Sequence, residues 1–192
     1  MYRFRSLRFV ADDAQGHLRL YLDGHDTLWL GTPSGLERFD HATATFQHYP
    51  LPLVLDIFED SEGTFWVGTV AGLMALDRET GATRILTHDP DDPSSLSSNS
   101  VSLLMEDRQG RLWVGTTTGG LNLFDRATQS FTRYMRDVDN PSGLSSNTVL
   151  EIMQAQDGTL GLRARGEQRE LAVSSAAAEL AQLCAAPRFT AA

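Results

Sequence analysis

The sequence predicts an all-β fold built from repeated units of four short antiparallel strands. The main observation is a motif that occurs three times, each time around a tryptophan: LWLGTPSGLERFD (28–40), FWVGTVAGLMALD (65–77) and LWVGTTTGGLNLFD (112–125). A short apolar run and an acidic turn precede each copy, and a stretch of polar and aromatic residues follows it. The tryptophans Trp29, Trp66 and Trp113 are 37 and then 47 residues apart, which is a period typical of stacked repeats.

The third unit shows the four expected strands most clearly. We name them strand a (101–107, VSLLMED), strand b (112–116, LWVGT), strand c (120–125, GLNLFD) and strand d (130–136, SFTRYMR). Runs of about five residues separated by Gly, Asp or Asn are typical of antiparallel strands. Four such strands in a repeat of 40 to 50 residues predict one blade of a β-propeller.

Each unit carries a glycine two positions after its tryptophan. Residues two apart in a strand share one face, and a glycine in a strand permits close approach of a neighbouring backbone. We expect this approach to lie beneath the indole ring. A phosphate-binding glycine loop is disfavoured, because such a loop normally occurs once, ahead of a helix. The predicted structural anchors of the repeat are therefore Trp29, Gly31, Trp66, Gly68, Trp113 and Gly115.

The segments between the units also repeat. HDPDDPSSLSSNSV (88–101) recurs as RDVDNPSGLSSNTV (136–149), 48 residues later, and we expect both to follow the same path outside regular strands. Together with VSLLMEDRQGRLWVGTTTGGLNLFD (101–125), these linkers resemble the two-component regulator propeller family over roughly residues 2 to 160. The resemblance implies part of the extracytoplasmic sensor region of a hybrid histidine kinase or diguanylate cyclase.

The resemblance breaks in a fourth unit. Aligned on Gly63, Gly110 and Gly158, this unit should have a tryptophan at position 161, but the chain has Gly161. In the tail, apolar residues at helical spacing predict a helix, and Pro187 would end this helix. Its apolar side is formed by Val173, Ala176, Ala177, Leu180 and Leu183. Two interpretations remain open: a weak amphipathic tail, or unselected sequence after an interrupted reading frame.

These patterns divide the chain into six parts. They are a lead-in segment (1–17), blade 1 (18–50), blade 2 with its linker (51–100), blade 3 with its linker (101–147), an incomplete fourth blade (148–160) and an unrelated tail rich in Ala and Arg (161–192). Three blades do not close a ring of four to eight. We therefore expect an open arc with an exposed apolar face, which favours self-association or contact with other propeller blades.

Composition narrows the functional classes. The formal net charge of −9 argues against nucleic-acid binding, and no apolar run reaches the ~18 residues of a membrane span. The N-terminus lacks the apolar core of a signal peptide, although the resemblance implies a periplasmic or otherwise extracytoplasmic location. The single Cys184 forms no disulfide within the chain.

The sequence offers little catalytic chemistry. Its five histidines (His17, His25, His41, His48 and His88) have no metal-ligand spacing, and DPDDPSS (89–95) and DVDNPSG (137–143) lack the glycine and the distal glutamate of a calcium loop. ALDRETGATR (75–84) resembles the turn of a pyrroloquinoline quinone repeat, but its single Asp-x-x-Thr-Gly is better explained as turn chemistry. We predict no catalytic residue, metal or cofactor.

Two functional hypotheses follow. The first is a non-catalytic module that senses an unknown small ligand, for which carbohydrate breakdown products are one theme of the family. The alternative is an enzyme on a propeller scaffold, such as a polysaccharide lyase, or a non-functional truncated product. Fold alone does not decide between them.

Overall fold

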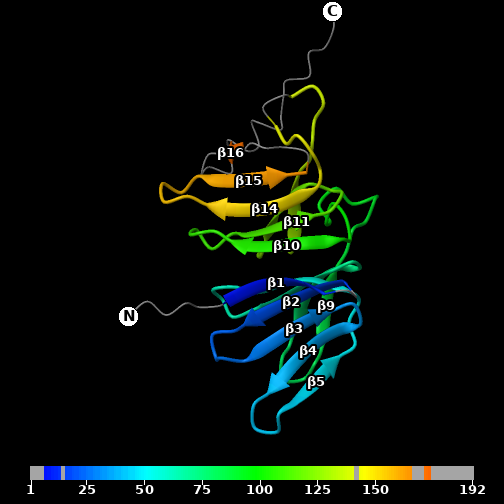
Figure 1. The fold of residues 1–192 in the computed structure, drawn as a ribbon. Helices are drawn as coiled ribbons and strands as arrows, with labels where there is room; N and C mark the ends of the chain where they lie inside the picture. The colour runs from blue at the N-terminus through cyan, green and yellow to red at the C-terminus, as the bar shows by residue number, and fades with distance from the viewer. Residues whose placement is uncertain (1–6, 14–15, 141–142, 166–170, 174–192) are drawn as a thin grey trace, which may run out of the picture.

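The structure is a computed structural model that describes residues 7–13, 16–140, 143–165 and 171–173. Every regular element among these residues is a β-strand. The strands form four antiparallel sheets in chain order, which confirms the predicted all-β, partly built propeller. Figure 1 shows the sheets with blade 1 at the bottom and the fourth unit at the top.

Each sheet is one blade, and its strands follow one another from a to d. The bounds for blade 1 are β2 (Gly16–Leu22), β3 (Leu28–Thr32), β4 (Gly35–Asp40) and β5 (Thr45–Tyr49). Blade 2 contains β6 (Val54–Glu59), β7 (Phe65–Thr69), β8 (Gly72–Leu76) and β9 (Thr83–Leu86). Blade 3 contains β10 (Val101–Glu106), β11 (Leu112–Thr116), β12 (Leu121–Asp125) and β13 (Ser130–Tyr134).

The fourth unit has more strands than the sequence predicted. Strand β14 (Val149–Gln154) pairs with β15 (Leu160–Ala164), which pairs with β16 (Leu171–Val173). The sequence predicts the incomplete fourth blade at residues 148–160, whereas its strands β15 and β16 continue past residue 160. The physical reason lies in Leu160 and Leu162, which alternate around Gly161 and are buried, as a strand with one buried face requires.

Two further expectations are affected at the ends of the chain. Val173, assigned to a helix, lies in strand β16, and the rest of the expected helix, which Pro187 was to end, lies outside the described part of the chain. Within the lead-in segment, β1 (Leu7–Asp13) is a fifth strand of blade 1, paired with β2.

The blades pack through their strands a. Contacts run from β2 to β6, from β6 to β10 and from β10 to β14. Strand a of the last three blades carries the same register shift, located between Val54 and Asp56, between Val101 and Leu103 and between Val149 and Glu151. Such bulges bend a strand and increase its twist, so the same bend recurs at the start of these three blades.

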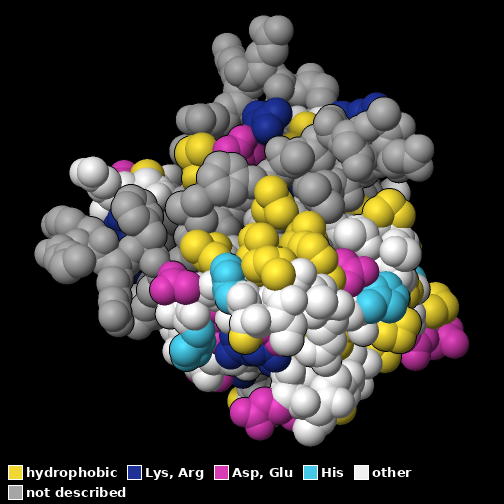
Figure 2. Space-filling model, turned by 60° about the horizontal axis from the view of Figure 1, so that its bottom comes forward, with side chains coloured by type: hydrophobic (Ala, Val, Ile, Leu, Met, Phe, Trp, Pro, Cys, Tyr) yellow, Lys and Arg dark blue, Asp and Glu magenta, His cyan; other side chains and the backbone are white. Residues whose placement is uncertain are grey.

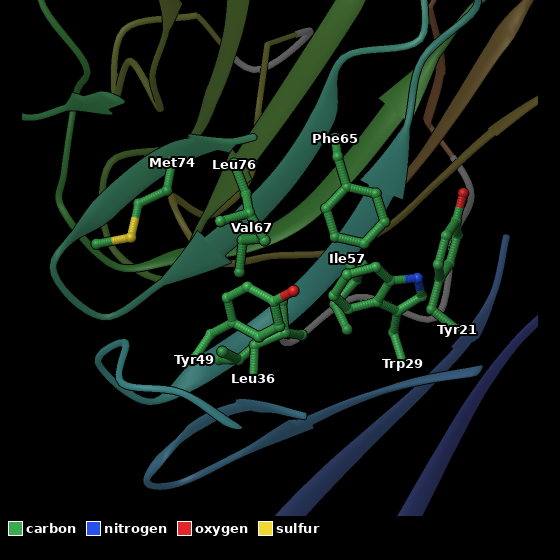
Figure 3. Close-up of a cluster of buried hydrophobic side chains, with 10 residues drawn as sticks. Tyr21, Trp29, Leu36, Tyr49, Ile57, Phe65, Val67, Met74 and Leu76 are labelled. Carbon is green, nitrogen blue, oxygen red and sulfur yellow. The ribbon is translucent and has the colours of Figure 1, made fainter. Parts of the chain in front are cut away.

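A blade has two faces, which we name by position in the stack. The leading face points toward the preceding blade and the trailing face toward the following one. Each junction between blades contains one of the three hydrophobic clusters. Figure 3 shows the first cluster: Tyr21, Trp29, Leu36 and Tyr49 on the trailing face of blade 1 meet Ile57, Phe65, Val67, Met74 and Leu76 on the leading face of blade 2. The core is therefore divided among the junctions.

Candidate functional site at the blade junctions

The three repeated tryptophans lie at the junctions between blades. Trp29, Trp66 and Trp113 are at most 1% exposed, each on a trailing face. The ring centroid of Trp29 lies 4.6 Å from that of Phe65 in the next blade, and that of Trp66 lies 5.4 Å from that of Phe124. Aromatic pairs at such separations add to the stabilisation from burial, so these residues hold neighbouring blades together.

A buried aspartate partners each tryptophan. Asp23, Asp60 and Asp107 stand six residues before their tryptophans, and each is 5% exposed. One carboxylate oxygen accepts a hydrogen bond from the indole N–H, at 3.0, 2.6 and 2.8 Å respectively. The other oxygen accepts two backbone N–H groups of the turn between strands a and b. The aspartate thus fixes both the turn and the indole.

An arginine of the following blade completes two of these contacts. Arg78 lies 3.2 Å from the carboxylate of Asp23 and 2.7 Å from that of Glu59. Arg126 repeats the arrangement one blade later, 2.6 Å from Asp60 and 2.9 Å from Glu106.

At the third aspartate the partner changes. Asp107 is paired with Arg111 of its own blade, at 2.6 Å. Two of the three aspartates therefore join their blade to the next one by a charged contact.

These contacts alter the acidity of Asp23. Burial alone would raise its pKa, but the indole N–H of Trp29, the backbone N–H groups of Thr27 and His25 and the charge of Arg78 together hold the pKa below its usual value. Conversely, burial would lower the pKa of Arg126, and its contact with Asp60 raises it instead. Asp23 at the first junction and Arg126 at the second are therefore each held in the charged form at neutral pH.

The repeated glycines make room for the next blade. A Cβ atom added to Gly31 would lie 2.6 Å from Cγ1 of Val54, and one added to Gly68 would lie 2.8 Å from the carbonyl oxygen of Val101. The third glycine, Gly115, faces Val149 at 3.3 Å in the same way. The glycines thus permit close approach, as expected, but to the first strand of the following blade and not beneath the indole.

The two long linkers follow matching paths. The backbone N–H of His88 donates to the side chain of Asn99, and that of Arg136 donates to Asn147, both at 2.6 Å. Leu96 and Leu144 are buried at equivalent positions. No described residue from 88 to 100 or from 137 to 147 lies in a strand, so the predicted shared path is confirmed.

Blade 3 holds its preceding linker by side chains. Buried Asn122 accepts from the backbone N–H of Ser97 at 3.0 Å and donates to its hydroxyl at 2.8 Å. Arg133 donates to the backbone carbonyls of Ser95 and Asp92 at 2.8 and 2.7 Å. The linker end of the stack is therefore ordered by polar contacts.

Two shallow surface hollows occur at equivalent places on blades 1 and 2. They have volumes of about 300 and 490 Å³. The first is lined by Thr27, Arg38, Phe39, Asp40, His41, Thr45 and Gln47, and the second by Gly63, Thr64, Phe65, Ala75, Leu76, Asp77, Ala82, Thr83 and Arg84. In the described part of the chain, no group of three or more His, Cys, Asp or Glu side chains is arranged to hold a metal ion.

Sequence reasoning found the tryptophans and glycines but missed their charged partners. The constant six-residue spacing from Asp23, Asp60 and Asp107 to a tryptophan was available in the sequence. Arg78 and Arg126 each follow the last aspartate of a unit, but the carboxylates that they reach belong to different strands and blades.

Stacked antiparallel sheets, joined by buried tryptophans and by Asp–Arg ion pairs, define an arc of β-propeller blades. Residues 49–71 and 95–118 match the two component regulator propeller family. Two segments of the chain, in blades 2 and 3, are therefore similar to the repeat of this family.

Solved structures of signalling proteins share the fold. The extracellular domain of a protein described as the hybrid two component system BT3049, from B. thetaiotaomicron, is 27% identical, with a TM-score of 0.63 over 80% of this chain and 21% of that chain. The extracellular domain of BT4673 from the same organism, described as a one component system, is 22% identical, with a TM-score of 0.62 over 81% of this chain and 20% of that one.

The extent of these similarities is limited in two ways. The chain spans about a fifth of the length of the two solved domains. None of the curated proteins matches it in sequence.

No helix in the described ranges is long and apolar enough to cross a membrane.

Proposed function

We propose that this chain forms part of the extracytoplasmic, ligand-sensing region of a bacterial signalling receptor of the two-component or diguanylate cyclase type. The observation that carries the proposal is the pair of matched repeats, together with the 27% identity to an extracellular domain described as belonging to a hybrid two component system. On this proposal the chain binds and transmits, and catalysis belongs to another part of the receptor.

The linker end of the stack is the proposed binding surface. The linkers and the turns between strands b and c meet there: the N–H of Thr117 donates to the carbonyl of Ser100, and the hydroxyl of Thr148 donates to the carbonyl of Thr117, at 3.0 and 2.8 Å. Loops held on a rigid scaffold are common sites of binding. A small ligand that bridges two linkers would tighten neighbouring blades, which gives the receptor a mechanical output.

The opposite end of the stack is less suited to chemistry or binding. Its buried carboxylates, Asp23, Asp60 and Asp107, already accept hydrogen bonds from turns and indoles. A carboxylate committed in this way is poorly placed to act as a general acid or base, because its oxygens already accept hydrogen bonds from structural donors and do not face a substrate. This observation favours the sensing function over a polysaccharide lyase.

A ligand screen tests the proposal. We expect acidic or neutral oligosaccharides to raise the melting temperature of the chain without being degraded, and product analysis of the same mixtures checks for turnover. At the linker end, replacing the hydroxyl pair Ser98 and Thr118 (2.9 Å apart) by alanines should weaken binding.

The matched control lies at the opposite end. The exposed hydroxyl pair Thr43 and Thr45 is 2.7 Å apart, and its replacement by alanines should leave binding unchanged. Degradation of an oligosaccharide, or equal loss of binding in both double variants, would contradict the proposed function.

A further inference from the structure

The hollow on blade 1 carries two opposite charges on one face. Its volume is about 300 Å³, at the lower end of the range for sites that bind small molecules. Arg38 and Asp40 of strand β4 both line it. Residues two apart in a strand share one face, and Arg38 lies opposite Trp29 in register, so both charges lie on the trailing face. Figure 2 shows basic and acidic side chains near one another on the blade 1 end of the molecule.

The Arg38 guanidinium has no hydrogen-bond acceptor among the described residues. Its Cζ lies 5.7 Å from the centroid of the Trp29 ring, and it forms neither a hydrogen bond nor an ion pair with another described side chain. A guanidinium presents five N–H donors in a rigid fork that matches the two oxygens of a carboxylate. This stacked, half-buried side chain is therefore already oriented to bind such a group.

The arginines over the other two tryptophans are already engaged. Arg84 stacks on the tryptophan of blade 2 and donates to the side-chain oxygen of Gln129. Arg111 stacks on the tryptophan of blade 3 and pairs with Asp107 at 2.6 Å. Of these three stacked arginines, Arg38 is therefore the one whose donors no described residue uses.

Asp40 supplies the negative charge, and unlike the buried aspartates of the junctions it is exposed. Its carboxylate accepts the backbone N–H groups of Ala42 and Thr43 at 2.8 and 3.4 Å. These N–H groups, and the charge of Arg38 as well, hold the pKa of Asp40 below its usual value, so the group is ionised at neutral pH. A carboxylate has about four acceptor sites, so part of this capacity remains for a cation. Asp40 and Arg38 do not pair with each other, so each can bind a separate group of one ligand.

A zwitterion complements this pair of charges. We propose that the hollow binds a free α-amino acid, whose carboxylate pairs with Arg38 and whose ammonium group donates to Asp40. Thr27 and Gln47 also line the hollow and offer uncharged hydrogen-bonding groups to a small polar side chain. The site lies at the end of blade 1 opposite the linkers, so it is a second site, separate from the sensing surface proposed above.

Other small ligands fit these charges less well. A simple carboxylic acid would place its anion near Asp40 without a cation of its own, and a simple amine would place its cation near Arg38 without an anion. A zwitterion has no net charge, so the formal net charge of −9 on the chain does not oppose its approach. The arrangement therefore selects a ligand that carries both groups.

The unchanged chain provides the first test. L-Serine is titrated into the isotope-labelled chain, and the backbone amide resonances are followed by NMR. We expect shifts in residues 38–47 and none in the linker at 88–100. L-Serine methyl ester and N-acetyl-L-serine each lack one of the two charges, so each should bind more weakly by about tenfold or more, the factor expected for loss of a hydrogen bond between charged groups.

Two variants locate the charges. Asp40→Asn keeps an oxygen that accepts the turn N–H groups but removes the negative charge, and Arg38→Gln removes the guanidinium. Each should weaken L-serine binding by about tenfold or more. The matched control is Asp125→Asn, which makes the same change in the equivalent turn of blade 3, where the carboxylate accepts the N–H groups of Ala127 and Thr128. This control should leave binding unchanged.

Three outcomes would overturn the proposal. They are the absence of shifts with L-serine at millimolar concentrations, binding of either blocked derivative as tight as that of L-serine, and an equal loss of binding in Asp125→Asn and Asp40→Asn. The comparison of the derivatives uses the unchanged chain, so it decides even if a variant fails to fold. No oligosaccharide enters this test, so its failure is distinct from failure of the sensing function.

Discussion

Blade 3 and the fourth unit have the same backbone through strands a and b, but they differ in the residues of their trailing faces. Both sheets pair their first two strands in one register, with the same bulge. Blade 3 carries Trp113 and Gly115, whereas the fourth unit carries Gly161 and Arg163. The buried residues that the two units do share lie on their leading faces, such as Leu112 and Leu160. A blade therefore docks through one set of residues and accepts its successor through another.

Removing the tryptophan of blade 3 should have the largest effect on stability. Trp113→Ala removes a fully buried indole from the junction with the fourth unit, and loss of a large aromatic side chain from a core costs about 3–5 kcal/mol. It also leaves Asp107 without one of its buried donors. Chemical denaturation should show this loss as a lower unfolding midpoint.

A control for this prediction is an exposed apolar residue. Val138 is 75% exposed, so Val138→Ala should leave the midpoint almost unchanged. If Trp113→Ala unfolds at the same denaturant concentration as the parent chain, the junction tryptophan does not stabilise the stack and the comparison of the two blades fails.

The repeated glycine should show the next largest effect. Gly68→Ala places a Cβ atom 2.8 Å from the carbonyl oxygen of Val101, and backbone has little freedom to move away. We expect a destabilisation of about 1–3 kcal/mol, as for other overpacked sites.

The fourth unit offers the matched glycine. A Cβ atom at Gly161 would lie 3.2 Å from Cγ of Met153, a flexible side chain that is 44% exposed. Gly161→Ala should therefore be nearly neutral in the same denaturation experiment. Equal costs at both glycines would show that backbone freedom, and not the approach of the next blade, explains the repeat.

The sequence predicted the blades because their signals are local. The apolar alternation of strands such as 112–116 and the turn residues between strands are read within a few positions. The contacts of Asp60 with Arg126 and of Asp23 with Arg78 join residues 66 and 55 positions apart. Such pairs depend on how blades stack, so the spacing of residues along the chain does not reveal them.

The error in the fourth unit has the same physical origin. The absence of a tryptophan at position 161 predicted the end of the blade, because each earlier strand b has a tryptophan as its second residue. Leu160 and Leu162 nevertheless satisfy the leading face, and that is sufficient for the strand to form. The sequence motif identified the residues that accept a next blade more clearly than those that build the blade itself.

The hydrogen bond between Trp29 and Asp23 should show a smaller, pH-dependent effect. Trp29→Phe removes the indole N–H donor, and loss of a hydrogen bond to a charged group costs about 1.5–3 kcal/mol. Packing of the phenylalanine ring and the remaining hydrogen-bond donors of Asp23 should offset part of this cost. We expect a net loss of about 1–2 kcal/mol near pH 7.

The sign of the pH dependence follows from the lowered pKa of Asp23. A carboxylate whose folded pKa is depressed stabilises the fold above its unfolded pKa of about 3.9, and this stability is lost as pH falls through the folded value. The stability difference between the parent chain and Trp29→Phe should therefore shrink below about pH 4. In the control Tyr49→Phe, the lost hydroxyl donates to the carbonyl of Arg78, an uncharged group, so its cost should not vary with pH. A constant difference for Trp29→Phe would contradict the role of the indole N–H.

The turn between strands c and d should give the smallest effect, and it compares three blades at one position. The three turns share a residue with positive φ: Ala44 at 55°, Gly81 at 74° and Gln129 at 57°. Each turn begins with an aspartate whose carboxylate accepts two backbone N–H groups of the turn, as Asp77 does from Glu79 and Thr80. These hydrogen bonds fix the same conformation in all three turns.

A left-handed conformation costs a residue with a side chain about 1–2 kcal/mol, partly offset by the greater freedom of glycine in the unfolded chain. Ala44→Gly should therefore stabilise the chain by about 0.5–1 kcal/mol, and Gly81→Ala should destabilise it by a similar amount. Thermal unfolding of the two variants checks both signs, and a change in the same direction for both would show that the turns differ in strain despite their shared shape.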